Sequence, residues 1–138
     1  MNLPDIGKKR VVIIGAGFGG ISLAKKLKNL DVQVVLIDKH NYHTFQPLLY
    51  QVSTSGLEPD SIAYPIRKIL KRLNNFYFRL ATVERINVNA KEVVTDIGNL
   101  TFDYLVIATG TKTNFFWEYQ YTRPCHADEK CSPSLKYS

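Results

Sequence analysis

The sequence lacks an apolar run long enough to cross a membrane. Its longest apolar stretch, Val11 to Phe18, is shorter than the ~20 residues that a transmembrane helix needs, and glycines interrupt it. Basic residues precede this stretch, but no small-residue cleavage site follows it, so we interpret it as a strand and not as a signal peptide. We therefore expect a cytoplasmic chain without a transmembrane helix.

Cysteine is absent from residues 1–124, and Cys125 and Cys131 both lie near the C-terminus. This distribution indicates neither a disulfide scaffold nor a zinc site. His40 and His43 are three residues apart, but no third ligand is evident, so we predict no metal site. The spacing also reveals no Ser-His-Asp triad and no pair of catalytic carboxylates. We therefore assign no catalytic side chain.

Acidic side chains are outnumbered, with 12 Asp and Glu against 18 Lys and Arg and a net charge of +6. The excess lies within residues 1–116, because residues 117–138 hold three of each sign. The basic residues are spaced like solvated helix faces, and no aromatic stacking motif accompanies them. We therefore predict no nucleic-acid binding. The length and a hydrophobic content of 45% favour one globular domain.

A glycine-rich turn joins a predicted strand to a predicted helix near the N-terminus. Residues 10–14 form the β-branched run typical of a strand buried in a parallel sheet. Leucines then recur at helical spacing, with lysines on the opposite face. A second buried strand over residues 33–37 ends at Asp38, so this segment predicts one right-handed βαβ unit. The leucines at helical spacing are Leu23, Leu27 and Leu30. The glycine-rich turn consists of Gly15, Ala16, Gly17, Phe18, Gly19 and Gly20.

This βαβ unit has the context that a dinucleotide-binding turn requires. Gly15 permits the tight turn, Gly17 lets the backbone approach a pyrophosphate, and Gly20 lets the helix pack against the sheet. The free N–H groups at the helix N-terminus would face the phosphates. Asp38 can accept hydrogen bonds from an adenosine ribose and would repel a 2'-phosphate. We therefore favour dinucleotide binding over a purely structural glycine turn.

The rest of the chain predicts a long loop, a helix and more strands. Residues 39–60 show no sustained period, and long ordered loops are usually functional. Pro65 suits the first position of a helix. A strand over residues 76–83 and three short alternating segments suggest a small antiparallel meander, and residues 104–108 resemble a buried strand again. We predict an α/β fold, a Rossmann-like domain with a parallel sheet and this meander. The predicted helix after Pro65 would bury Ile66, Ile69, Leu70 and Leu73. The three short alternating segments are residues 85–88, 92–95 and 100–102.

Two later segments, residues 81–88 and 101–110, favour FAD over NAD as the bound dinucleotide. Residues 101–110 form a strand that ends in Ala-Thr-Gly, which alone indicates only a buried strand with a glycine turn. Together with the first glycine turn, this segment resembles the second FAD fingerprint of flavoproteins with two dinucleotide domains. Residues 81–88 resemble the segment in which a valine backbone pairs with adenine. The resemblance implies bound FAD, with Val83 at the adenine, Asp38 and Lys39 at the adenosine end, and Thr109 and Gly110 beside the cofactor.

The segment NYHTFQPLLYQVSTSGLEPDSIAYPIR, residues 41–67, resembles the type II NADH dehydrogenases, the non-proton-pumping NADH:quinone oxidoreductases. In that family this segment runs along the isoalloxazine ring. Plain core packing is the alternative for its apolar residues, and for Leu48 and Leu49 we prefer it. The resemblance places Asn41, Phe45, Gln46 and Pro47 near the flavin.

The resemblance implies that hydride passes from NADH to FAD and that electrons then pass to a membrane quinone, with the flavin doing the redox chemistry. A sulfide:quinone or ferredoxin-type reductase is an alternative, disfavoured by the missing loop cysteines. A third possibility is a non-catalytic remnant that binds FAD. The family's members are longer, with a second nucleotide domain for NADH and a C-terminal part that contacts the cytoplasmic face of the inner membrane. We expect this chain alone to be inactive.

The resemblance covers residues 10–116, so we assign residues 1–116 to the FAD-binding part and residues 117–138 to an irregular tail. The tail shows neither a strand period nor a helix period. One back-translation of residues 117–130, shifted by one nucleotide, gives GNTNIRDHAMPMK, which is similar to the family's continuation. Codon choice leaves freedom at many positions. Our hypothesis is a frameshifted or truncated gene.

Overall fold

A parallel sheet of four strands forms the centre of the fold, in the order β5-β2-β1-β9. The structure is a computed structural model and describes residues 1, 3–71, 73 and 75–111. The parallel sheet confirms the predicted fold class. Its strands are β1 (Arg10–Ile14), β2 (Gln33–Asp38), β5 (Phe76–Leu80) and β9 (Tyr104–Ile107).

The first βαβ unit forms where the sequence predicts it. The strand β1 pairs in parallel with β2, from Arg10 opposite Gln33 to Ile14 opposite Ile37. The helix α1 (Phe18–Lys26) and the 3-10 turn η1 (Leu27–Asn29) connect them. The leucine pattern was wrong at Leu30, which is 55% exposed. Because α1 ends at Lys26, the chain leaves the helical path before Leu30, and Ile21 and Ala24 fill the buried positions of the helix.

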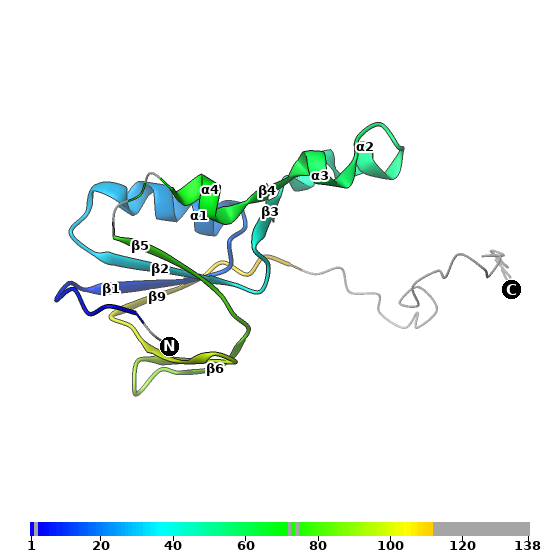
Figure 1. Cartoon of the computed structure of the whole chain (residues 1–138). Helices are drawn as coiled ribbons and strands as arrows, with labels where there is room; N and C mark the ends of the chain where they lie inside the picture. The colour runs from blue at the N-terminus through cyan, green and yellow to red at the C-terminus, as the bar shows by residue number, and fades with distance from the viewer. Residues whose placement is uncertain (2, 72, 74, 112–138) are drawn as a thin grey trace, which may run out of the picture.

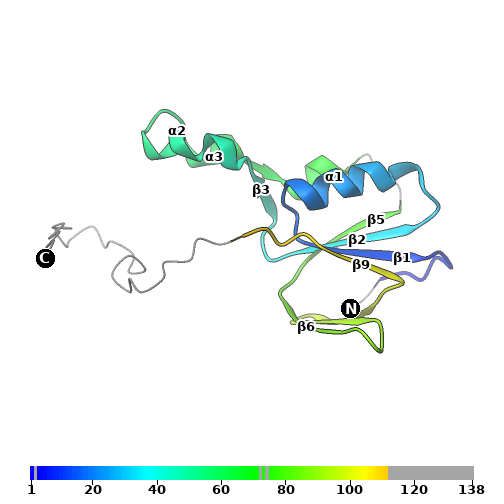
Figure 2. The same ribbon diagram turned by 180° about the vertical axis from the view of Figure 1, so that it is seen from behind.

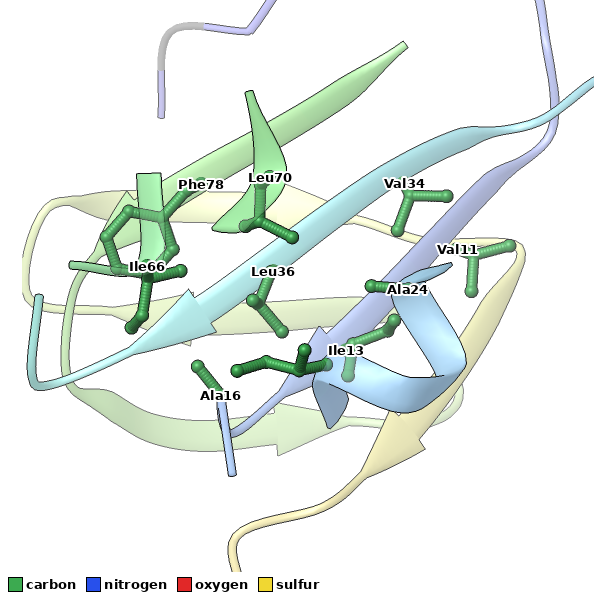
Figure 3. Packing of buried hydrophobic residues seen from close by; sticks show 10 residues of the cluster. Val11, Ile13, Ala16, Ala24, Val34, Leu36, Ile66, Leu70 and Phe78 are labelled. Carbon is green, nitrogen blue, oxygen red and sulfur yellow. The ribbon is translucent and has the colours of Figure 1, made fainter. Parts of the chain in front are cut away.

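The sheet is packed on both of its faces. Successive side chains of a strand point to opposite faces, so Val11 and Ile13 lie on the helix side while Val12 and Ile14 lie on the other. Figures 1 and 2 show α1 on one face and the β6 layer on the other. Figure 3 shows the helix-side cluster. The buried residues of this cluster are Val11, Ile13, Ala16, Ile21, Ala24, Val34, Leu36, Ile66, Leu70 and Phe78.

The helix α4 (Ile66–Leu70) completes the helix layer. Ile66 is fully buried and Leu70 nearly so, while Ile69 and Leu73 pack against the same cluster, as the sequence predicts. Pro65 lies one position earlier than expected, as the residue that precedes the helix.

The antiparallel meander covers the other face of the sheet, with Val93 and Leu100 buried against it.

The prediction of one strand over residues 76–83 was wrong, because the chain leaves the parallel sheet after β5. The Ala81 N–H donates to the Asp38 carbonyl (3.0 Å), and the Thr82 N–H donates to Asp96 Oδ1 (2.9 Å). The meander consists of β6 (Val83–Asn87), β7 (Glu92–Thr95) and β8 (Gly98–Thr101).

The segment between β2 and α4 extends away from the sheet (Figure 1), and we call residues 42–65 the arm. The sequence predicts an irregular loop up to residue 60, whereas the arm contains short helices and strands. Elements of three to five residues are too short to show a hydrophobic period. Neither these short helices nor any other in the described part of the chain could cross a membrane. The arm contains β3 (Tyr42–Thr44), η2 (Gln46–Leu48), α2 (Leu49–Ser53), α3 (Pro59–Ile62) and β4 (Ala63–Pro65).

The contrast between Leu36 and Leu30 gives a test of this packing. Leu36 is fully buried in β2, so we expect Leu36→Ala to lower the free energy of unfolding by about 2–5 kcal/mol through the cavity it leaves. Leu30→Ala removes an exposed side chain and should change it by less than about 0.5 kcal/mol. Urea denaturation followed by circular dichroism measures both variants. Equal losses would contradict the assigned core.

Candidate functional site

Two adjoining cavities lie where β1, β2 and β9 end. The larger has a volume of about 530 Å3 and the smaller about 130 Å3. Asp38, Lys39 and Thr109 line both of them. In an open parallel sheet, ligands bind at the carboxyl ends of the strands. The position of the cavities therefore marks this edge as the candidate site.

The glycine turn closes against two backbone segments that leave no room for side chains. Gly15 has a φ of +104°, and its N–H donates to the Ile37 carbonyl (2.8 Å). A Cβ at Gly15 would collide with the backbone of Ala108, and a Cβ at Gly20 would collide with the Gly15 carbonyl oxygen. Both positions therefore require glycine for the close approach of turn, helix and β9.

Gly17 differs from these two glycines because it borders open space. Apart from Gly17 and its neighbours in the chain, no atom lies within 4 Å of a Cβ built at this position, and Gly17 lines the larger cavity. It is also the residue that precedes α1, where no side chain caps the helix and the first turn holds no acidic residue. The first N–H groups of a helix have no partner within the helix and carry a partial positive charge. This end of the cavity is therefore suited to an anion.

The carboxylate of Asp38 lies against the glycine turn. Its Oδ2 accepts from the Ala16 N–H (2.5 Å), and its Oδ1 accepts from the His40 N–H (2.8 Å). A carboxylate has about four acceptor positions, so both oxygens can still accept further hydrogen bonds. The structure thus places Asp38 on the same side as Gly17, with hydrogen-bonding capacity left for a ligand.

The last strand, β9, brings its following residues to the same place. The Ala108 N–H donates to the Ile14 carbonyl (2.7 Å), which holds residues 108–110 beside Gly15. Thr109 and Gly110 consequently line the larger cavity. They are far from the glycine turn in the sequence but line the same cavity as its residues.

His43 is one of the site residues that the sequence does not predict. It was considered only as a metal ligand, yet its Nδ1 lies 3.1 Å from the Ala16 carbonyl oxygen. Its ring meets the Phe18 ring edge-on, with centroids 4.9 Å apart, and Phe18 meets Phe45 in the same way at 5.5 Å. Its only sequence signal is its place within the segment of residues 41–67.

Most of the predicted site residues line one of the two cavities. Those in the larger cavity are Ala16, Gly17, Phe18, Gly19, Asp38, Lys39, Gln46, Thr109 and Gly110. Those in the smaller cavity are Gly15, Asp38, Lys39, Val83 and Thr109.

Four predicted residues line neither cavity. Gly20 packs beneath the turn, and the Asn41 carbonyl accepts from the Ile66 N–H (3.0 Å). Phe45 is 43% exposed beside Phe18, and Pro47 lies in η2. The contact of Gly20 with the diphosphate, and of Asn41, Phe45 and Pro47 with the flavin, stays a prediction. The larger cavity is also lined by residues that were not predicted: His40, Tyr42, His43, Thr44, Ala108 and Thr111.

Metal-binding clusters do not occur within the described ranges, where no three His, Cys, Asp or Glu residues come together. Cys125 and Cys131 lie outside the described residues, as does the predicted tail of residues 117–138. The polar groups around the larger cavity include backbone N–H groups, the carboxylate of Asp38, the ammonium group of Lys39 and several uncharged polar side chains.

Comparison with known proteins identifies relatives of this chain. The profile of the pyridine nucleotide-disulphide oxidoreductase family matches residues 9–130. A type II NADH:quinone oxidoreductase of Mycobacterium tuberculosis is 43% identical over 114 residues, covering 80% of this chain and 24% of that protein. One of Staphylococcus epidermidis is 34% identical, covering 79% and 28%. The chain thus spans about a quarter of the length of these relatives, and they bear the family name that the sequence predicts.

Solved structures show the same fold. The sulfide:quinone oxidoreductase of Aquifex aeolicus superposes with a TM-score of 0.75 and 36% identity, over 83% of this chain and 27% of that one. The NDH2 of Plasmodium falciparum in complex with NADH gives a TM-score of 0.71 and 28% identity, over 79% and 24%.

The two kinds of glycine in the turn give a matched pair of variants. We expect Gly20→Ala to lower the free energy of unfolding by about 1–3 kcal/mol, because α1 must move away from the Gly15 carbonyl. Gly17→Ala adds the same methyl group in open space and should change stability by less than about 0.5 kcal/mol. Thermal unfolding without ligand measures both. A destabilised Gly17→Ala variant would show that the turn is packed differently.

Proposed function

Because the chain belongs to the pyridine nucleotide-disulphide oxidoreductase family, we propose that it is the FAD-binding part of an NADH:quinone oxidoreductase. The observation that supports this most is the meeting of Gly17, Asp38 and Thr109 around adjoining cavities at one sheet edge. The relatives named type II NADH:quinone oxidoreductases support the choice of reaction.

The diphosphate and adenosine of FAD fit the residues at the glycine turn. The backbone of residues 15–20 and the N-terminus of α1 would hold the diphosphate, because the space beside Gly17 is open. Asp38 would accept from the ribose, with Lys39 beside it. The smaller cavity has apolar walls that include Ala81 and Val83, which suits a flat adenine ring.

The flavin end of FAD would extend toward the arm. Gln46 lines the larger cavity together with Thr44, and Thr109 and Gly110 border it from β9. Asn41, Phe45 and Pro47 are proposed to lie near the isoalloxazine ring, as the family resemblance implies. Two elements far apart in the sequence would then enclose the flavin.

When bound, the flavin would supply the redox chemistry, which is the acceptance of a hydride from NADH and the transfer of electrons to a quinone. The described residues bind and orient it, and none of them is assigned as a proton donor. Since this chain spans about a quarter of its relatives, we propose that the NADH and quinone sites involve other parts of a longer protein. A quinone acceptor would bring that protein to the cytoplasmic face of a membrane.

A sulfide:quinone oxidoreductase is the second candidate, because one such structure is 36% identical with a TM-score of 0.75. The sequence weighs against thiol chemistry at this site, since residues 1–124 contain no cysteine. A remnant that binds FAD without turnover is the third candidate.

Gly17→Ala tests the proposed cofactor position. We expect the purified chain to bind FAD, and Gly17→Ala to raise the dissociation constant about tenfold, equivalent to about 1.4 kcal/mol, because its methyl group enters the phosphate space. Flavin fluorescence titration measures both. Lys28→Ala, on the exposed η1 turn, is the control and should bind like the parent. A parent chain without affinity for FAD would overturn the proposal.

Electron donors distinguish the sulfide:quinone candidate from the other two. We expect the FAD-loaded chain to retain flavin with little oxidation of NADH by a water-soluble quinone, because the NADH and quinone sites are proposed to lie elsewhere. Absorbance at the NADH band and at the flavin band measures both quantities. Rapid NADH oxidation would show a self-sufficient enzyme, and sulfide-dependent flavin bleaching would favour the second candidate.

A further inference from the structure

Ala16 is held by side chains on both of its peptide groups. Its N–H donates to Asp38 Oδ2 at the end of β2 (2.5 Å), and its carbonyl oxygen lies 3.1 Å from His43 Nδ1 in β3. Ala16 itself is only 3% exposed. A residue in the middle of the glycine turn is therefore fixed by two separate elements, one of which belongs to the arm.

The contact with Ala16 determines which nitrogen of His43 carries hydrogen. A carbonyl oxygen can only accept, so Nδ1 must be the donor. In the neutral ring, Nε2 is then an acceptor. The hydrogen bond thus assigns the Nδ1–H tautomer to His43.

The ring of His43 is held in place by its neighbours. Phe18, the first residue of α1, packs edge-on against it at an interplanar angle of 88°. The backbone of β3 is paired with β4, with His43 opposite Tyr64, and the Phe45 N–H donates to the Ile62 carbonyl (2.9 Å). The imidazole therefore donates its Nδ1–H to the Ala16 carbonyl from a strand that is held in place by its pairing with β4.

We propose that His43 is a positioning residue that preorganises the glycine turn for the diphosphate of a dinucleotide. The Ala16 carbonyl and the Gly17 N–H belong to one planar trans peptide, in which they point in opposite directions. Holding the carbonyl toward His43 therefore fixes the direction of the Gly17 N–H, at a residue that lines the larger cavity. The inference rests on the proposed function, because it concerns the same cofactor site.

A preorganised turn binds more tightly because less conformational freedom is lost when the ligand arrives. Asp38 orients the peptide before Ala16, and His43 orients the peptide after it. Loss of either side chain would leave one peptide free to rotate. The effect of His43 should consequently appear in cofactor affinity, even though the imidazole acts through the backbone.

Two substitutions separate the donor from the ring. His43→Phe keeps an aromatic ring beside Phe18 but removes the donor, whereas the side-chain amide of His43→Asn can place an N–H near the position of Nδ1. We expect His43→Phe to raise the dissociation constant for FAD roughly threefold to tenfold, the size expected for one hydrogen bond. His43→Asn should recover most of the affinity. Fluorescence titration of the full chain measures both, with exposed Tyr64→Phe as the control.

Further measurements distinguish positioning from folding. Thermal unfolding without FAD should give similar midpoints for His43→Asn and the parent, and 15N NMR of the parent's imidazole should show the Nδ1–H tautomer. Equal FAD affinity in all variants, equal loss in the Phe and Asn variants, or an Nε2–H tautomer would overturn the inference. A parent chain that fails to bind FAD would instead refute the proposed function. Should His43→Phe not fold, the tautomer in the parent chain decides, because an Nε2–H tautomer excludes the hydrogen bond to the Ala16 carbonyl.

Discussion

The close approach of backbone to backbone at the glycine turn is the constraint on which the site depends. A methyl group at Gly20 would overlap the Gly15 carbonyl, and one at Gly15 would overlap the backbone of Ala108. Without side chains at these two positions, α1 can begin directly at the end of β1, and β9 can end beside it. The helix N-terminus, the end of β2 and the residues after β9 therefore meet at one edge.

The two central strands beneath this edge, β1 and β2, are buried on both faces. Val12 and Val35 pack toward the meander, while Ile13 and Leu36 pack toward the helices, and all four are fully buried. Close packing of this kind resists small displacements. The carboxylate of Asp38 therefore keeps a fixed position relative to Ala16 and to the N-terminus of α1 that follows it.

Residues of the arm contact the same glycine turn and line the same cavity. The arm contributes Gln46 to the lining of the larger cavity and His43 to the hold on Ala16. The α2 helix of the arm buries none of its residues, and Tyr50 is 63% exposed. An element with so little of its own core is positioned mainly by the β3–β4 pairing and by contacts near Phe18. The arm therefore connects the distal part of the larger cavity to the glycine turn.

The parallel βαβ unit, the glycine turn with Asp38 at the next strand end, and the β7 strand could all be predicted from the order of the amino acids. Each is encoded by neighbouring residues with a visible period or spacing. Three features became apparent only in the folded structure: the exposure of Leu30, the departure of the chain from the sheet after Leu80, and the contact between His43 and Ala16. These features depend on hydrogen bonds and packing between residues distant in the chain. No local pattern records such a contact, because its two partners meet only after the sheet, α1 and the arm have assembled.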